Sequence, residues 1–254
     1  MFNGFFPFRR FAVFLAMSVL LCGCASFFPG SPSMPETTRM HDQDTLFARV
    51  NMTLSTVEGH YPLRAAIVAR RPGYLRLEIL PIIGTPDFFL CATPHEMKIF
   101  IPSRGEFYYG APSAENVARF LPWSFSIEDL VSILRGDYPA MTGNHHMTDK
   151  KQSEAGGEIV TMRDASGVEQ VVRRDASGRL TAIVRYLPSG GELYEIRFED
   201  YSMGNFLPGR ITVRVSEPPG TLVVKYHDSR IEKGVDLSAF ELMLPEGIRA
   251  LPLD

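Results

Sequence analysis

The sequence has few cysteines, no long apolar run and no excess of basic residues, and each shortage excludes a class of protein. Of its 3 cysteines only Cys91 lies beyond residue 24, so no disulfide can form within that part of the chain. Lys and Arg total 26 against 29 Asp and Glu, which argues against a nucleic-acid partner. The apolar run Phe11–Leu21 has only about half of the ~20 residues that a membrane-spanning helix needs.

The chain also lacks the patterns of common catalytic and metal sites. It contains no Gly-x-Ser-x-Gly elbow and no phosphate-binding glycine loop. The pair His145–His146 has no second cluster of ligands at metal-binding spacing, so we expect an exposed pair. Cys91 lies in the apolar run Phe88–Ala92 and is expected to be a small buried hydrophobic residue. We therefore expect neither enzyme activity nor a bound cofactor or metal.

The N-terminal segment has the order of a secretory signal peptide. Two arginines precede the apolar run, which ends in Leu21-Cys22-Gly23-Cys24. This ending resembles the lipobox of bacterial lipoproteins, in which cleavage follows a small residue and the next cysteine is acylated. Cys24 follows a glycine whereas Cys22 follows a bulky leucine, so we predict removal of residues 1–23 and lipidation at Cys24. The alternative is an ordinary signal peptide with incidental cysteines.

The residues after Cys24 predict a location and a tether. Bacterial lipoproteins typically carry three acyl chains, which anchor far more firmly than one. In enteric bacteria an Asp directly after the lipidated cysteine favours the inner membrane; Ala25 stands here, which predicts the outer membrane. Residues 24–44 are rich in Pro, Ser and Thr and are expected to form the lipid anchor and a flexible tether. Residues 45–254 then form one domain.

From Leu46 onward, apolar and polar residues alternate over many short segments separated by turn residues. The segment 73–80 is the clearest, with Leu75, Leu77 and Ile79 on one face. Such a succession predicts an antiparallel meander in a sandwich or barrel of about ten to twelve strands. The expected strands are 46–56, 60–70, 73–80, 88–93, 97–101, 107–109, 158–163, 169–174, 179–188, 192–201, 209–216 and 221–227.

Two segments in the middle of the chain change to helical spacing. Ser113 is a suitable N-cap for a helix over residues 114–121. Ser126 begins a second helix, which has acidic residues in its first turn and stops at Gly136. Two short helices inserted in a β domain are expected to lie on the sheet or to cover its opening.

The connections between strands are polar, with one exception. The stretch Tyr138–Gly157 is expected to be a loop, and the tetrapeptide Asp-Ala-Ser-Gly occurs twice, as in type I hairpin turns. The turn Leu80–Pro86 is apolar instead and has Ile82 and Ile83 near its tip. This turn either folds back onto the core or is exposed and inserts into a membrane or a partner's groove.

These features make the chain resemble the LolA/LolB superfamily, and most closely the LolB-like lipoproteins. The resemblance rests on the lipobox, the helical insert and two motifs. Tyr74–Gly84 is a strand followed by Pro, apolar residues and Gly, and Phe240–Gly247 has the form Phe-x-Leu-x-x-Pro-x-Gly. The match covers most of residues 45–254. It implies a mainly β domain, an incomplete antiparallel β-barrel whose opening is covered by two short helices and whose apolar cavity accepts acyl chains.

The resemblance also implies a function. LolB takes a lipoprotein from a periplasmic carrier and places it in the outer membrane. By analogy, this chain would face the periplasm, bind acyl chains, and receive or insert lipoproteins or another lipid; its partners would be the membrane, the acylated cargo and a carrier protein. The membrane-insertion role of the family's apolar loop falls on Ile82 and Ile83. Candidates for the cavity cover, with plain core as the alternative, are Phe120, Trp123, Phe125, Leu130 and Leu134. The alternative function is a structural or sensory envelope lipoprotein that binds a protein partner.

Overall fold

The computed structural model describes residues 40–253 except 82, 122–124, 142, 144 and 203–204. The predicted signal peptide, Cys24 and most of the predicted tether lie outside these residues. The described elements belong to one unit of the chain, Thr37–Asp254. They are β1 (Thr45–Thr56), β2 (Gly59–Arg70), β3 (Tyr74–Leu80), β4 (Phe88–Ala92), β5 (Met97–Ile101), η1 (Pro102–Arg104), β6 (Glu106–Gly110), α2 (Ala114–Ala118), α3 (Ile127–Leu134), β7 (His145–Gln152), β8 (Glu158–Asp164), β9 (Glu169–Arg174), β10 (Leu180–Tyr186), β11 (Glu192–Glu199), β12 (Arg210–Val215), β13 (Gly220–Glu232), η2 (Leu237–Phe240) and β14 (Ala250–Pro252).

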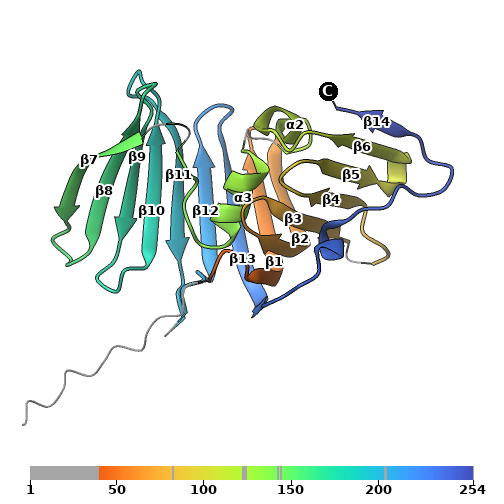
Figure 1. The fold of residues 1–254 in the computed structure, drawn as a ribbon, viewed down its shortest axis with the longest axis horizontal. Helices are drawn as coiled ribbons and strands as arrows, with labels where there is room; N and C mark the ends of the chain where they lie inside the picture. Colours follow the sequence, from red (N-terminus) through yellow and green to blue (C-terminus); the bar gives the residue numbers. More distant parts are fainter. Residues whose placement is uncertain are drawn as a thin grey trace, which may run out of the picture. The chain divides into compact units, whose positions relative to one another are not determined.

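The described strands form one sheet of 14 strands in the order β14-β6-β5-β4-β3-β2-β1-β13-β12-β11-β10-β9-β8-β7 (Figure 1). Neighbouring strands are antiparallel, except that β14 is parallel to β6. The two edge strands, β14 and β7, do not pair with each other, so the sheet is not closed. This confirms the predicted fold class, an incomplete antiparallel β-barrel.

In the middle of the sheet, the first strand, β1, pairs with β13, a strand from near the C-terminus. β1 pairs with β13 from Thr45↔Glu232 to Thr56↔Gly220, and with β2 along its other side. Because side chains alternate between the faces of a strand, Leu46, Ala48 and Val50 are buried together on the inner face.

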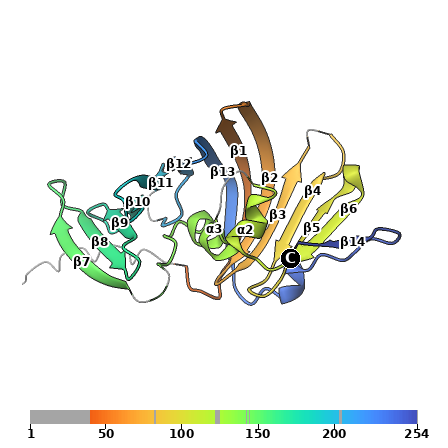
Figure 2. The same cartoon turned by 90° about the horizontal axis from the view of Figure 1, so that it is seen from above.

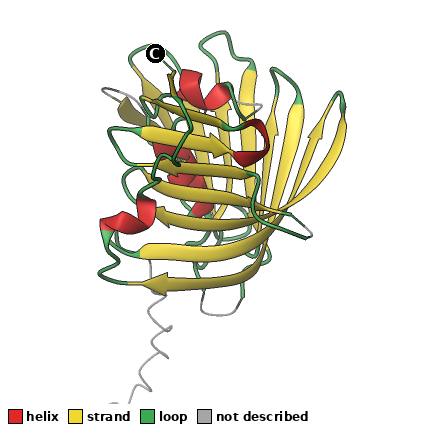
Figure 3. Ribbon diagram, turned by 90° about the vertical axis from the view of Figure 1, so that its right-hand side faces the viewer, coloured by secondary structure: helices red, strands yellow, loops and turns green. Residues whose placement is uncertain are grey.

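The sheet curves around the two α-helices. Figure 2 shows α2 and α3 on the concave side, in front of the middle strands. Figure 3 shows that the strands at the two ends of the sheet run in very different directions, as the twist of a large sheet requires. Apolar side chains on the concave face pack with both helices in one buried cluster, which includes Ile67, Leu90, Ile99, Ile183, Ile196, Ile211, Val117 and Val131.

The C-terminal segment covers part of the outer, convex face. Phe240 is only 2% exposed, and its ring centroid lies 5.4 Å from that of Tyr74 on β3. The guanidinium of Arg76 donates to the carbonyls of Ala239 and Glu241, each at 3.3 Å. The chain then returns to the sheet as β14, beside β6. The β3–β6 part of the sheet is therefore packed on both faces.

The structure differs from the sequence prediction in several elements, among them β13, which continues to Glu232 beyond the predicted end at residue 227. It has fourteen strands instead of ten to twelve, and the two missed strands are the edges β7 and β14. β7 lies within the stretch Tyr138–Gly157, so the prediction of a loop there was wrong. The first helix ends at Ala118, short of the predicted Leu121. The helix that follows Ser126 has the predicted start and end.

The two Asp-Ala-Ser-Gly turns have the same hydrogen bonds. Asp164 Oδ1 accepts from the amides of Ser166 at 2.9 Å and Val168 at 3.0 Å. Asp175 Oδ1 accepts from the amides of Ser177 at 2.9 Å and Arg179 at 3.0 Å. Each carboxylate thereby satisfies backbone donors that a tight turn leaves without partners.

Candidate functional site

Helix α3 covers the concave face where a ligand of the implied kind would bind. The Ser126 hydroxyl accepts from the Asp129 amide at 3.1 Å, which caps the first turn. The apolar stripe of the helix turns inward, so Ile127, Val131 and Ile133 are buried among the strand side chains. The position of α3 therefore decides whether the concave face is accessible.

The C-terminal end of α3 is closed by a Schellman motif. The Asp137 amide donates to the Ser132 carbonyl and the Gly136 amide to the Ile133 carbonyl, both at 2.9 Å. Gly136 has a φ of 74°, and a Cβ there would lie 2.7 Å from Pro208 Cδ. Glycine is thus required both by the backbone conformation and by the neighbouring chain.

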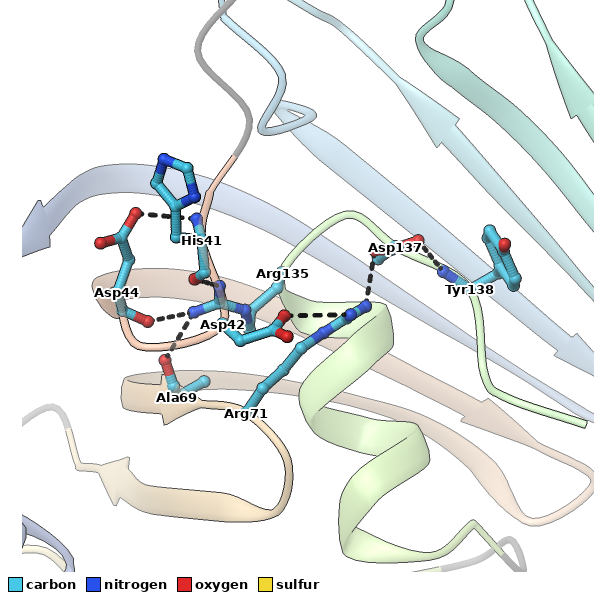
Figure 4. Close-up of polar contacts among 8 residues, drawn as sticks. All are labelled: His41, Asp42, Asp44, Ala69, Arg71, Arg135, Asp137 and Tyr138. Carbon is cyan, nitrogen blue, oxygen red and sulfur yellow. Dashed lines mark hydrogen bonds and ion pairs between the residues drawn. The ribbon is translucent and has the colours of Figure 1, made fainter. Parts of the chain in front are cut away.

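The C-cap residue of α3, Arg135, joins the helix to the first described residues. Its side chain is buried, and its guanidinium donates to the carbonyls of His41 at 2.7 Å, of Ala69 at 3.4 Å and, over a short contact, of Asp44 (Figure 4). Burial lowers the pKa of Arg135 from its ordinary value, and the charge of Arg71 nearby adds to this effect. Three carbonyls from two separate segments therefore accept from this one cation.

A second group of contacts supports the same end of α3. Arg71 forms ion pairs with Asp137 at 2.5 Å and with Asp42 at 3.4 Å (Figure 4). The Tyr226 hydroxyl on β13 donates to the Leu134 carbonyl at 2.6 Å. The end of α3 is thus connected to the strands β2 and β13 and to the segment that precedes β1.

The residues after α3 cross the inner face of β9 and β10 through polar contacts. Gln170 Nε2 donates to the Pro139 carbonyl at 3.1 Å. Arg185 donates to the Ala140 carbonyl at 3.1 Å and, through Nε, to Gln170 Oε1 at 3.0 Å. On α3 itself, burial raises the pKa of Asp129, and the positive charge of Arg185 opposes this rise. The cover is therefore held by apolar packing near its start and by buried polar groups near its end.

Four of the five predicted cover residues are described, and all four pack against the buried cluster of the concave face. The ring centroid of Phe120 lies 5.1 Å from that of Tyr108, and the ring centroid of Phe125 lies 5.2 Å from that of Tyr194. Leu130 and Leu134 are half-buried on the same cluster. Trp123 lies outside the described residues. The described side chains of α3 are therefore packed against those of the sheet.

The predicted insertion loop projects from the sheet. Ile83 is 90% exposed, while Ile82 lies outside the described residues. Val57, at the tip of the β1–β2 hairpin, is 84% exposed. The pairing of β1, β2 and β3 places both tips at one end of the strands, and places His41–Asp44 at the other end.

The cysteine and the histidine pair considered in the sequence are Cys91 and His145–His146. Cys91 is buried and free, and burial raises its pKa to about 11, so the thiol is neutral at ordinary pH. His145 and His146 are exposed neighbours on β7. Within the described residues, no group of three or more His, Cys, Asp or Glu could hold a metal ion. None of the helices in the described part of the chain has both the length and the apolar character to cross a bilayer.

Sequence reasoning did not identify Arg135, Gln170 and Arg185 as important. The one signal for Arg135 was its position before Gly136, where a cation favours a helix C-terminus. Its actual acceptors lie more than sixty residues earlier in the chain, at His41, Asp44 and Ala69. No spacing rule connects such distant partners.

Comparisons with known proteins identify the fold. No protein-family model and no curated protein matches the sequence. The structure is similar to a candidate outer membrane lipoprotein-sorting protein domain from Vibrio parahaemolyticus (TM-score 0.55, 16% identity, covering 79% of this chain and 90% of that one). It is also similar to a LolA superfamily protein from Nitrosomonas europaea (TM-score 0.56, 15% identity, covering 81% of this chain and 94% of that one). A DUF1329 family protein from Desulfovibrio piger is similar as well (TM-score 0.56, 13% identity, covering 79% of this chain and 90% of that one). The chain therefore has the LolA/LolB fold.

Proposed function

We propose that this chain is a lipoprotein anchored in the outer membrane through Cys24, which binds acyl chains beneath α3 and receives or inserts lipoproteins or another lipid. The observation that carries the proposal is the apolar concave face closed by one short helix. Acyl chains gain ~0.8 kcal/mol for each CH₂ group removed from water, so an uncovered face of this kind would bind them without any chemical step. On this proposal the chain is a binding protein and not an enzyme.

The contacts of α3 suggest how the cover moves. Its end is fixed through Arg135 to carbonyls of His41 and Asp44, the residues that lead from the predicted tether into β1. A change at this segment would release the guanidinium and the end of the helix together. We therefore place the opening motion at α3 and the residues after it, while the β3–β6 part, packed on both faces, serves as the fixed frame.

Cross-linking with a photoreactive palmitate analogue tests the binding site. We expect the full chain, purified in non-ionic detergent, to be labelled on α3 and on the inner face of β9–β12, and unlabelled palmitate to compete. Labels confined to the outer face, or no competition by palmitate, would contradict the proposal. In that case the packed space beneath α3 favours the alternative, a structural or sensory lipoprotein that binds a protein partner.

The insertion role of Ile82 and Ile83 has a geometric requirement. Leu80, where the apolar loop begins, lies level with Asn51 of β1, about 20 Å along the strand from Thr45, and Ile83 lies three residues further on. The residues from Ala25 to Met40, before the segment that Arg135 holds, could reach about 55 Å if fully extended. This reach is enough for Cys24 and Ile83 to meet one membrane if the tether runs back along the body.

Shortening the tether tests that requirement. Deleting residues 27–38 would leave four residues before the held segment and a reach of about 14 Å, too short for the loop and the anchor to share a bilayer. We expect this variant to stay anchored and folded but to lose transfer, and a Gly/Ser replacement of equal length to restore it. The double variant Ile82→Glu with Ile83→Glu should show the same loss with a normal tether. Normal transfer by the double variant would exclude the loop as the insertion device.

A further inference from the structure

A small hollow beside the end of α3 is lined by three arginines. Its volume is about 100 Å³, and its lining includes Met40, Arg71, Arg135, Asp137, Arg174 and Phe206. This volume is well below the ~300 Å³ at which pockets for drug-sized ligands begin, so it suits one small group and not an acyl chain. The hollow borders the buried apolar cluster proposed to bind acyl chains, because Leu180 belongs to both, but its other lining side chains are mostly polar or charged.

Of the charged side chains that line the hollow, three are arginines and one, Asp137, is a carboxylate. Arg71 is paired with Asp137 and Asp42. Arg135 contacts carbonyl oxygens, and Arg174 donates to the Gly178 carbonyl at 3.3 Å and lies over the Tyr138 ring. Among the described residues, neither Arg135 nor Arg174 has a carboxylate within ion-pair distance. Two guanidiniums therefore line the hollow without an anionic partner.

The placement of these groups suits an oxyanion. Arg135 is only 5% exposed, so its charge is shielded from the water that would otherwise solvate it. A guanidinium binds phosphate through parallel charge-assisted hydrogen bonds, and a tetrahedral phosphate can accept from several directions at once. Arg71 follows β2, Arg135 ends α3 and Arg174 ends β9, so one anion would contact three separate elements.

We propose that this hollow binds a phosphate group held by Arg135 and Arg174, with Arg71 at its edge. The phosphate belongs either to a free phosphate ion or to a phospholipid headgroup. A bound phosphate would neutralise the two unpaired cations and link the end of α3 to β9, which would hold the cover in the position described here. This proposal does not depend on acyl-chain binding.

Calorimetric titration of the full chain with inorganic phosphate, in non-ionic detergent at low ionic strength, tests the site. The matched variants are Arg174→Gln and Arg173→Gln, since Arg173 is the preceding residue on β9 and is exposed. We expect Arg174→Gln to weaken phosphate binding about tenfold and Arg173→Gln to leave it within about twofold. Arg174→Lys keeps the charge without the guanidinium geometry and should give an intermediate affinity, which protects the test against misfolding of the Gln variant.

A second titration identifies the source of the phosphate. The ligand is glycerophosphoglycerol, the water-soluble headgroup of phosphatidylglycerol. Binding at least as tight as that of inorganic phosphate assigns the site to a lipid headgroup, and clearly weaker binding assigns it to the free ion. Equal phosphate affinity in Arg174→Gln and Arg173→Gln, or no binding by the wild type at millimolar phosphate, overturns the site. Neither titration uses an acyl chain, so failure here leaves the proposed acyl-chain binding untouched.

Discussion

The sheet has two arms, β3–β6 and β8–β12, on either side of its middle strands. Both arms have apolar side chains on the inner face, but their outer faces differ. Over β3–β6 the outer face carries aromatic side chains, and the C-terminal segment packs on it through Phe240. Over β8–β12 the outer face carries ion pairs, such as Arg163 with Glu169 at 2.6 Å and Arg214 with Glu195 at 2.8 Å. The first arm is packed in three layers, and the second has water on its outer side.

This difference shows which arm can move. Exposed ion pairs contribute little, at most about 1 kcal/mol each, whereas a buried aromatic side chain contributes several times more. The β3–β6 arm should therefore stay rigid while the residues after α3, which lie on the other arm, rearrange around a ligand. The following experiments would break or sharpen this contrast, beginning with the largest effect.

Removing the aromatic side chain that holds the C-terminal segment should destabilise the covered arm most. Phe240→Ala leaves a cavity against Tyr74 and should lower the free energy of unfolding by about 3–5 kcal/mol. Met243→Ala, three residues later and 84% exposed, is the matched control and should change it by less than about 0.5 kcal/mol. Urea denaturation measures both. Equal values would mean that the outer layer does not stabilise the arm.

Removing the cation at the end of α3 should loosen the cover. Arg135→Met removes the guanidinium donor from the carbonyls of His41, Asp44 and Ala69, of which the His41 carbonyl keeps the Asp44 amide at 3.0 Å, and should lower the free energy of unfolding by roughly 2–3 kcal/mol. Hydrogen exchange should show faster exchange in α3 than in β3–β6. Arg173→Met, an exposed position, is the control. Unchanged protection of α3 would remove Arg135 from the opening mechanism.

Gly157, in the β7–β8 hairpin of the exposed arm, tests whether this hairpin is packed as tightly as the strands of the covered arm. A Cβ on Gly157 would lie 2.1 Å from the Arg174 carbonyl oxygen, whereas at Gly191 its nearest neighbour would be Ser189 Oγ at 3.8 Å. Gly157→Ala should lower the free energy of unfolding by about 1–2 kcal/mol, and Gly191→Ala should lower it by less than about 0.5 kcal/mol. Thermal unfolding measures both. Similar melting temperatures for both variants would show that the β7–β8 hairpin adapts freely.

Two carboxylates, one on α3 and one in the turn between β8 and β9, should change stability with pH in opposite directions. Burial raises the pKa of Asp129 on α3, so its contribution to stability is full below about pH 4 and is lost as pH rises through the raised value. Hydrogen bonds from Ser166 and nearby amides lower the pKa of Asp164, so its contribution is present above about pH 4 and is lost as pH falls through the lowered value.

The corresponding Asn variants check these signs by urea unfolding across the acidic and neutral range. Relative to wild type, Asp129→Asn should become more stable as pH rises from about 4 to 7. Asp164→Asn should be less stable near pH 7 and approach wild type in acid. A common sign for both variants would show that the two carboxylates have similar surroundings.

Most strands were predictable because each pairs on both sides and buries one face. Leu75, Leu77 and Ile79 alternate with charged residues, and β3 forms there as expected. The two missed strands are the edges, where this pattern is absent. In β7 nearly every residue is exposed, and β14 is only 3 residues long. An edge strand is defined by its neighbour's hydrogen bonds and not by its own hydrophobic pattern.

The first and last residues of α3 were predictable from the sequence, but its hydrogen-bond partners were not. Ser126 and Gly136 marked where α3 begins and stops, because capping depends on adjacent residues. The acceptors of Arg135 and the carbonyls held by Gln170 and Arg185 come from segments that only the folded chain brings together. The pairing of aromatic rings on the outer face was hidden for the same reason, since Phe240 and Tyr74 are far apart in sequence.

The pairing of β1 with β13 also determines when this molecule can finish folding. Contacts such as that between Arg49 and Asp228 join residues 179 positions apart, so the central strand pair forms only after nearly the whole chain is available. During synthesis the N-terminal end emerges first, and β1 must wait beside β2 with one edge unpaired. Chains truncated before β13 should therefore remain unfinished and aggregate, however complete their other hairpins are.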